Sequence, residues 1–415
     1  GGAYNSLVAV QGDLTLGGTL SITPNTAGPN VNNNSLDPGL YRLYTYGGTL
    51  SGAADQTLAP TSVAPGATAS LQTSIDHQVN LVINYGNLTF WDGGSTTNRS
   101  NNTVDGGSGT WDAQTGTNDL NWTDKTGQTN GPWVNGQFVV YAGNAGTVTV
   151  QDTYNGVTNN VVASGMQFAN NDGKIYTVTG DNIYANSAST LIRVGDGTTA
   201  GASITAILDT VLNDQLVSGG TSLVKTDLGT LIITKDQTYQ GATSINGGVL
   251  QLGNGGTSGA LAAGTAIHNN GVLAINHSGT FTLAQSIDGT GGLAQNGAGT
   301  TVLSANSTYT GATTVTQGTL EVDGSITSSS VDVSNGGTLS GSGSVGDTVI
   351  GSGGTLATPD VQNSVRVAGN LQTAQNSTLA LQGTDQHSGK VMKRQGTQYQ
   401  KMKTNILSVG GSAAP

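Results

Sequence analysis

The chain has 415 residues, of which 65 are glycine, and charged residues make up only 9% of it. Hydrophobic residues reach 35%, which argues against charge-driven disorder, and the 8 prolines without a Gly-X-Y period exclude a collagen helix. The net charge of −11 argues against a nucleic-acid partner, and the absence of cysteine excludes disulfides and thiolate metal sites.

The first 89 residues open with a strand-like alternation of apolar and polar residues, from Leu14 to Ile22. A Pro- and Asn-rich excursion, residues 24–38, follows and is too polar to line a core. Residues 1–89 therefore predict coils of short strands, interrupted by a loop that leaves the scaffold. Asn32 and Asn33 on this loop are candidate partner-binding residues.

Residues 90–220 hold all four tryptophans of a chain in which aromatics make up 5%. Exposed indoles would form a platform for stacking sugars, so Trp91, Trp111, Trp122 and Trp133 are candidate partner-binding residues. Buried indoles would instead fill an irregular stretch of core. The intervals between Trp91, Trp111 and Trp133 are close to the length of one solenoid coil. This spacing favours burial, with three indoles stacked inside the scaffold.

Residues 221–389 contain a duplicated segment, with copies at 221–252 and 291–322, 70 positions apart. Apolar, glycine and tyrosine positions match between the copies, so that Leu223, Gly229, Tyr239, Gly248 and Leu250 recur as Leu293, Gly299, Tyr309, Gly318 and Leu320. Duplication at a fixed offset is typical of repeat architectures. We expect the two tyrosines to pack the same corner in each copy.

A shorter unit, Gly followed by Thr or Val and then Leu, recurs along the chain. Its closest spacings, from Gly229 to Gly248 and along Gly318, Gly337 and Gly354, approach the length of one solenoid coil. No long stretch keeps the apolar period of 3.6 that a helix needs. These patterns predict an all-β chain, a right-handed parallel β-helix (β-solenoid) rod with protruding loops and about 20 residues per coil. An antiparallel sandwich would predict hairpins rather than a fixed coil length.

Residues 390–415 differ from the rest of the chain. Five of its 13 basic residues fall here, and no acidic residue follows Asp385. We expect a solvated basic loop over 390–403 and a final strand at 406–409. No run of 18 apolar residues occurs, so no transmembrane helix is expected.

The repeat copies and three further segments resemble a known family. The runs 223–231 and 238–250 resemble the autotransporter-associated β-strand repeat, and the second copy matches as well. Segments 39–43, 90–94 and 192–197 are similar to elements that accompany such repeats in AIDA-like and pertactin-like passengers. The chain therefore resembles an autotransporter (type V secretion) passenger domain over most of its length.

This resemblance implies a protein on the cell surface of a Gram-negative bacterium, or secreted from it. The implied fold is a β-helix that is exported through its own C-terminal outer-membrane barrel. The alternating strands and aromatic girdles of such a barrel do not occur in the sequence. We therefore expect a fragment that is truncated before the translocator.

Catalytic β-helices that act on polysaccharides carry clustered carboxylates. The acidic residues here are scattered, and the two groups that come closest are Asp119, Asp124 and Lys125 beside Trp122, and Asp209 and Asp214 with Lys225 as nearest base. The four histidines lack a His-Glu-x-x-His metal motif, and no serine-protease signature occurs. We expect no enzyme activity, no cofactor and no bound metal.

The favoured hypothesis is a non-enzymatic surface adhesin or self-association factor, active in cell aggregation or biofilm formation. Its expected partners are host extracellular matrix or serum proteins, glycans, or a neighbouring rod, bound through loops 24–38 and 91–133. A structural stalk that presents another domain is one alternative, and a polysaccharide-acting β-helix enzyme is the other. No motif identifies the ligand.

Overall fold

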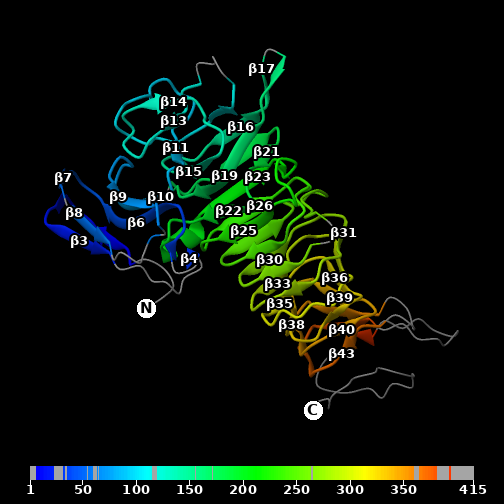
Figure 1. The fold of residues 1–415 in the computed structure, drawn as a ribbon. Coiled ribbons are helices and arrows are strands. Elements are labelled where there is room, and N and C mark those ends of the chain that lie inside the picture. The colour runs from blue at the N-terminus through cyan, green and yellow to red at the C-terminus, as the bar shows by residue number, and fades with distance from the viewer. Residues whose placement is uncertain are drawn as a thin grey trace. The chain divides into compact units, whose positions relative to one another are not determined.

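A computed structural model describes residues 6–22, 31–32, 35–53, 55–58, 63, 65–114, 119–154, 156–170, 172–262, 265–358, 364–380 and 392–393 (Figure 1). These residues are all-β apart from one short 3₁₀-helix, η1 (Thr199–Ser203), and their parallel sheets confirm the predicted β-helix. No helix within the described ranges could span a membrane. The chain divides into unit 1, residues 1–241 with 246–248, and unit 2, residues 242–245 with 249–415.

Unit 1 begins with two stacked coils. Each strand of the first coil pairs in parallel with one of the second: β1 (Val8–Val10) with β6 (Gly39–Tyr46), β2 (Leu14–Leu16) with β7 (Leu50–Gly52), and β3 (Thr19–Ile22) with β8 (Asp55–Leu58). Asp13 Oδ1 accepts the N–H of Thr49, at the matching place in the next coil, at 2.7 Å. The predicted coils of short strands are therefore present at the start of the chain.

Two antiparallel hairpins depart from that prediction. The first joins β9 (Thr68–Gln72) to β10 (Gln78–Asn84), and β10 also pairs antiparallel with β6. The link between its strands contains left-handed His77 (φ 58°) and is too short for the crossover that a parallel pair needs. The second, β4 (Val31–Asn32) with β5 (Ser35–Leu36), lies inside 24–38, where we expected only a loop.

The rest of unit 1 stacks its strands in two main sheets. The first has the order β14 (Asn130–Gly131), β13 (Trp122–Thr123), β11 (Leu88–Trp91), β15 (Gln137–Tyr141), β19 (Val161–Phe168), β22 (Ser189–Val194) and β25 (Ser222–Thr226). The second has the order β12 (Gly109–Asp112), β16 (Thr147–Gln151), β20 (Tyr176–Gly180), β23 (Thr205–Asp209) and β26 (Thr230–Ile233). Beside them lie β21 (Ile183–Ala185) with β24 (Leu212–Asn213), and the hairpin β17 (Thr153–Tyr154) with β18 (Val157–Thr158).

The coils that these two sheets form are called the main coils here, and the first main coil runs from Trp91 to Tyr141. The main coils are longer than the predicted length of about 20 residues. Trp91 pairs with Tyr141 in the next coil, and Tyr141 pairs with Phe168 in the coil after that, so the first of these coils is nearly twice as long as the second. The extra residues of the first main coil form two long connections, 92–108 and 113–136, the second of which contains β13 and β14. Strand β13 pairs antiparallel with β11 and so covers the edge of the sheet.

A buried polar network ties β6 to the main coils of unit 1. Arg42 forms an ion pair with Asp196, with 3.0 Å between Nη1 and Oδ2. Gln167 Nε2 donates to the carbonyls of Leu40 at 2.8 Å and Gly195 at 2.9 Å, and its Oε1 accepts the Leu40 N–H at 2.7 Å. The buried side chains of Arg42 and Gln167 therefore gain polar partners in place of water, as burial requires.

Arg193 is the centre of the same network. Its fully buried guanidinium pairs with Asp227, with 3.0 Å between Nε and Oδ2, and donates from Nη1 to the Pro38 carbonyl at 2.7 Å. It also lies 4.2 Å from the ring centroid of Tyr41, a cation–π contact. The sequence segments that contain Tyr41 and Arg193 thus meet in the structure, where they hold the scaffold together.

Unit 2 is a run of shorter coils in four sheets. In this unit, one sheet contains β27 (Thr243–Ile245), β29 (Ile267–Asn269) and β32 (Ile287–Asp288). A second contains β28 (Val249–Leu252), β30 (Val272–Ile275), β33 (Gly292–Gln295), β35 (Thr313–Val315), β38 (Val331–Val333), β41 (Thr348–Ile350) and β44 (Leu371–Thr373). A third contains β37 (Ser325–Ile326), β40 (Ser344–Val345) and β43 (Arg366–Val367). The fourth is β31 (Thr280–Leu283), β34 (Thr300–Leu303), β36 (Thr319–Val322), β39 (Thr338–Ser340), β42 (Thr355–Ala357), β45 (Thr378–Ala380), β46 (Met392–Lys393).

The strand register of unit 2 confirms the predicted coil length. Five threonines that open successive strands are register partners in turn: Thr280, Thr300, Thr319, Thr338 and Thr355. Each step between them is therefore close to the expected coil of about 20 residues. These strands are parallel throughout, and only β46 runs antiparallel to its neighbour. Strand β46 lies where we expected a basic loop, and the predicted final strand at 406–409 lies outside the described residues.

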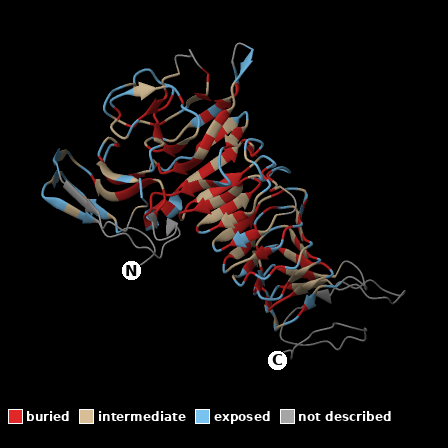
Figure 2. Ribbon diagram, viewed as in Figure 1, coloured by how far each residue is buried: buried red, intermediate tan, exposed pale blue. Residues whose placement is uncertain are grey.

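The core of each unit follows the strand alternation (Figure 2). In β36, Leu320 and Val322 are buried, whereas the residues between and before them are half-exposed. Tyr309 is fully buried, and its hydroxyl lies 2.7 Å from Thr313 Oγ1. Tyr239 is equally buried at the matching place in the first repeat copy. Both tyrosines fill the core beside the same turn of the repeat, as expected.

A buried lysine closes one turn of the first repeat copy. Lys225 Nζ donates to the carbonyls of Asp227 at 2.8 Å, Gly229 at 2.5 Å and Gly247 at 2.8 Å. Burial lowers the pKa of Lys225 to about 7, although the Asp227 carboxylate acts in the opposite direction. Three carbonyl acceptors match the three donors of an ammonium group.

A glutamine closes the corresponding turn of the second copy. Gln295 Nε2 donates to the carbonyls of Gly297 at 2.8 Å and Gly299 at 3.4 Å. Its Oε1 accepts the hydroxyl of Thr301 at 2.6 Å. The side chain is 1% exposed, so the amide is fully committed to the scaffold.

Candidate functional site

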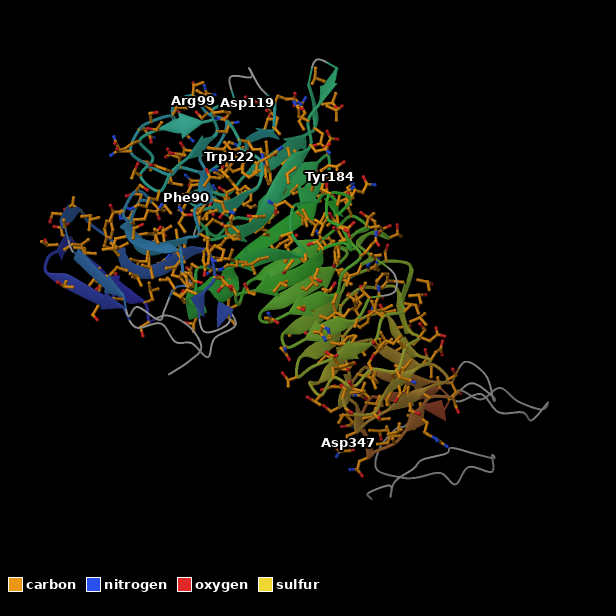
Figure 3. All side chains as sticks on the ribbon, viewed as in Figure 1. Phe90, Arg99, Asp119, Trp122, Tyr184 and Asp347 are labelled. Atoms are coloured by element: carbon orange, nitrogen blue, oxygen red, sulfur yellow. The ribbon has the colours of Figure 1, made fainter. Side chains whose placement is uncertain are left out.

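The tryptophan region lies in the first main coil of unit 1, and Figure 3 labels Trp122 in it. Trp91 ends β11, Trp111 lies on β12, Trp122 opens β13, and Trp133 follows β14. Their exposed fractions are 0%, 0%, 3% and 7%. Burial, which the sequence favoured, is therefore confirmed. These four side chains offer no surface for stacking sugars, and the exposed platform is wrong.

The indoles form one cluster around Trp122. Its ring centroid lies 4.9 Å from that of Trp91, 5.3 Å from Trp111 and 4.7 Å from Trp133. The contacts with Trp91 and Trp111 are edge-on, an arrangement that aromatic pairs favour. We expected Trp91, Trp111 and Trp133 to stack coil upon coil. This is wrong, because Trp91 and Trp111 lie on different sheets of the same coil.

A different set of aromatic residues recurs once per coil. Trp91, Tyr141 and Phe168 are register partners on three consecutive parallel strands. The rings of Tyr141 and Phe168 stack with centroids 4.8 Å apart, and Tyr141 lies 6.3 Å from Trp91. The sequence did not reveal this column, because the intervals between its members are unequal and both exceed the expected coil length.

The cluster and its neighbours hold the two long connections in place. Trp91 Nε1 donates to the Gly107 carbonyl at 2.7 Å. The buried carboxylate of Asp92 accepts the Asp105 N–H and the Asn130 side-chain amide, each at 2.8 Å. Burial raises the pKa of Asp92 to about 6, and these hydrogen bonds oppose the rise. Asp92 therefore orders the surface loops while its own side chain is buried.

The same connections bring two carboxyl groups together. Burial is the largest cause that raises the pKa of Asp119 to about 6, and a hydrogen bond with the Asp112 carboxyl is the second. The charge of Arg99 opposes this rise. Figure 3 labels Arg99 and Asp119 on these loops. Glycosidase carboxyls stand roughly 5 to 9.5 Å apart, on either side of a sugar bond. Two carboxyls in direct contact leave no such gap.

Asp124 and Lys125, which the sequence placed with Asp119, have local roles. Asp124 Oδ1 accepts the N–H and the hydroxyl of Thr126 at 2.8 and 2.6 Å. Lys125 Nζ donates to the Leu71 carbonyl at 2.9 Å, which ties this loop to β9. Neither side chain is directed at a shared centre.

The second acidic group is also separated by the fold. Asp209 lies 3.7 Å from Nζ of Lys235, while Asp214 Oδ2 accepts the Gln240 N–H at 2.6 Å. Lys225, the nearest base in sequence, is enclosed by carbonyls elsewhere in unit 1. The described part of the chain holds no group of three side chains that could bind a metal ion.

The histidines occupy unrelated environments. His268 Nδ1 lies 2.7 Å from Asp288 Oδ1 on the surface of neighbouring coils. His277 is buried and stacks on Phe281 with ring centroids 4.2 Å apart. His387 lies outside the described residues.

Residues 24–38 are described only in part. Asn32 lies in β4, but its side chain is not described, and Asn33 lies outside the described residues. Their role in binding stays a prediction. The inner end of the excursion is fixed to the scaffold, since Asp37 is buried and Pro38 accepts a hydrogen bond from Arg193.

Two exposed apolar side chains of unit 1 were not singled out from the sequence. Val134, after β14, is 57% exposed, and Val157, on the protruding hairpin of β17 and β18, is 56% exposed. The hairpin could have been predicted, because Asn155-Gly156 between two short alternating runs is a strong turn signal. The exposure of Val134 could not be predicted from the order of apolar and polar residues, because Val134 directly follows Trp133, which is apolar too.

Comparison with known proteins adds to this geometry. The family described as Passenger-associated-transport-repeat matches residues 223–252 and 293–322, the two repeat copies. In an alignment 377 positions long that covers 84% of this chain, the sequence is 37% identical to the "Adhesin BmaC autotransporter" of Brucella suis biovar 1 (strain 1330). The chain is an autotransporter passenger sequence. The resemblance inferred from the sequence is therefore confirmed.

This passenger sequence spans only 10% of the length of that curated relative. No solved structure matches it. The repeat match covers residues that turn corners and fill the core, such as Leu223, Gly229 and Tyr239. The family match therefore describes the scaffold, and the loops must be judged on their own geometry.

Proposed function

We propose that this autotransporter passenger acts as a bacterial surface adhesin, without chemical conversion of its partner, through the loops of the first main coil and the hairpin of β17 and β18 in the coil after it. The relative whose match covers 84% of this chain is named an adhesin. The observation that carries the proposal is the contrast between the long coil from Trp91 to Tyr141 and the much shorter coil from Tyr141 to Phe168. The long coil contains residues that the strand pairing does not require, and a buried aromatic cluster orders them. This arrangement favours a surface that binds a partner.

The partners we propose are host matrix or serum proteins, glycans, or the same protein on a neighbouring cell. Export to the surface of a Gram-negative bacterium would place the loops where such partners are met. Val134, on the second connection of the first main coil, and Val157, on the hairpin of β17 and β18 in the next coil, are exposed apolar side chains that a partner would cover. Covering apolar side chains contributes to binding in proportion to the area removed from water.

Display of the chain on a non-adherent bacterium tests this proposal. The readouts are cell aggregation and binding to immobilised matrix proteins, serum proteins and glycans. We expect Val134→Glu or Val157→Glu to weaken binding by about tenfold, which corresponds to about 1.4 kcal/mol. The matched control is Val8→Glu, at a 48% exposed valine of β1.

Surface expression of each variant is quantified by antibody staining, so that a loss of display is not read as a loss of binding. Equal binding by the parent and by the double variant Val134→Glu/Val157→Glu would contradict the assignment to these loops. Absence of binding and aggregation for the parent would favour the structural stalk instead.

A further inference from the structure

A hollow lined by hydroxyl groups lies at one corner of the later coils of unit 2. Its volume is about 340 Å³, within the range of small-ligand sites. It spans successive coils and is lined by Thr310, Thr327, Ser328, Ser329, Ser330, Gly346, Asp347, Ala368 and Gly369. None of the described residues in this lining has an aromatic or cationic side chain.

The hollow arises where one turn is shorter than its neighbours. The turn between β40 and β41 consists of Gly346 and Asp347 alone, whereas residues 327–330 and 368–370 form the turns before and after it. Gly346 lets the coils approach closely, since a Cβ there would lie 2.3 Å from the Ser329 carbonyl oxygen. The short turn is therefore recessed between two longer ones.

A chain of hydrogen-bonded hydroxyl groups lies beneath the hollow and reaches its lining at Ser329. Tyr309 Oη lies 2.7 Å from Thr313 Oγ1, which lies 2.8 Å from Ser329 Oγ. Ser329 Oγ also donates to the Gly311 carbonyl at 2.7 Å. Ser329 is 1% exposed, and the exposed hydroxyls of Thr327, Ser328 and Ser330 lie at the rim.

Asp347 supplies the charge of the hollow, and Figure 3 labels it at the surface. Its Oδ1 accepts the Asn370 N–H at 2.7 Å, which fixes the carboxylate towards the next coil. Gly369 leaves room for it, since a Cβ there would lie 2.1 Å from that oxygen. No hydrogen bond to Oδ2 occurs among the described residues, so this oxygen is available to a ligand.

We propose that this hollow binds an uncharged pyranose unit of a glycan. A sugar offers several neighbouring hydroxyls, which both donate to the free carboxylate oxygen and accept from the rim hydroxyls of Thr327, Ser328 and Ser330. A carboxylate disfavours uronic and sialic acids, because like charges repel at close range. The proposal rests on the adhesive function above and adds to the loops of unit 1 a second contact site, in unit 2, with one class of ligand.

Saturation-transfer NMR on the complete chain tests the hollow directly. The probes are the methyl glycosides of mannose, galactose and N-acetylglucosamine, with N-acetylneuraminic acid as the charged comparison. We expect at least one neutral glycoside to bind with a Kd in the millimolar range and the acid to give no signal. Binding of none of the three, or equal binding of the acid, would overturn the proposal.

Variants identify the site. Asp347→Ala should weaken the bound glycoside at least fivefold, and Ser328→Tyr, at an exposed rim position, should block the hollow. Asp332→Ala removes an exposed carboxylate of β38 outside the hollow and should change nothing. Unchanged binding in both hollow variants would overturn the assignment. Circular dichroism of each variant separates lost binding from lost folding.

The outcome is distinguishable from failure of the adhesin proposal. If displayed Asp347→Ala chain adheres like the parent while the glycoside no longer binds, the hollow is a sugar site that adhesion does not use. If the parent does not adhere at all, the proposed function fails, and the glycoside titration still decides the hollow.

Discussion

Lys225 and Gln295 take equivalent places in the two repeat copies and hold equivalent turns by different chemistry. The lysine ammonium donates to three carbonyls, and the glutamine amide donates to the two that correspond in sequence, those of Gly297 and Gly299. What the repeat preserves is a donor at the centre of the turn. The identity of that donor differs between the copies.

Lys225→Gln should make stability less dependent on pH. The folded-state pKa of Lys225 is about 7, against about 10.5 when unfolded, so the cost of burying the charge is fully present below pH 7. That cost is relieved as the pH rises from 7 to about 10, because only the unfolded state then binds the proton. Urea unfolding between pH 6 and 10 should show the parent gaining stability relative to the variant. Parallel curves would contradict the prediction.

Gly248→Ala should destabilise the same turn. Gly248 has φ +62°, and a Cβ there would lie 2.4 Å from Lys225 Nζ. We expect a loss of about 1 to 3 kcal/mol in the free energy of unfolding. The control is Gly256→Ala, where the added Cβ meets open space and φ is not positive. Thermal midpoints that fall equally in both variants would show that the turn carries no special constraint.

Asp227→Asn should leave the Arg193 charge buried without its partner. Asparagine tolerates the left-handed backbone at this position (φ 63°), so the effect reports the charge and not backbone strain. Loss of one partner of a buried pair costs about 3 to 5 kcal/mol. Denaturant unfolding checks this value. The exposed-site variant Asp332→Asn is the control, and a similar midpoint for both would refute the prediction.

The tryptophan fluorescence of the folded chain should resist iodide. All four indoles are at most 7% exposed, so an ionic quencher has little access to them. We expect a quenching constant several times smaller than that of the chain unfolded in urea. Strong quenching in the folded state would mean that the cluster opens in solution, and the exposed sugar platform would then have to be reconsidered.

The fold could be predicted from the sequence where spacing and register coincide. In unit 2 the Gly-Thr-Leu units recur at nearly the strand offset, so the coil length followed directly from Gly318, Gly337 and Gly354. In unit 1 the same reasoning failed, because long connections separate Trp91 from its register partner Tyr141. The near-coil spacing of Trp91 and Trp111 therefore predicted that they stack, although they lie on different sheets.

The candidate site was less predictable, because its determinants are contacts distant in sequence. Burial of the indoles was predicted from their spacing, but their cluster depends on the antiparallel pairing of β13 with β11, which places Trp122 between Trp91 and Trp111. The hollow near Asp347 depends on the difference between two turn lengths. No local pattern reports such a difference, since each turn alone consists of ordinary small polar residues.

The unequal coils of unit 1 have a consequence for how such a passenger can change. A parallel ladder requires one strand per sheet in each coil and places no limit on the chain between strands. The coil from Trp91 to Tyr141 and the shorter one that follows it contribute equally to the same ladder. Insertions can therefore accumulate in the connections while the neighbouring coils keep their pairing. New binding specificities can arise in such a protein by lengthening a connection, without redesign of the repeat.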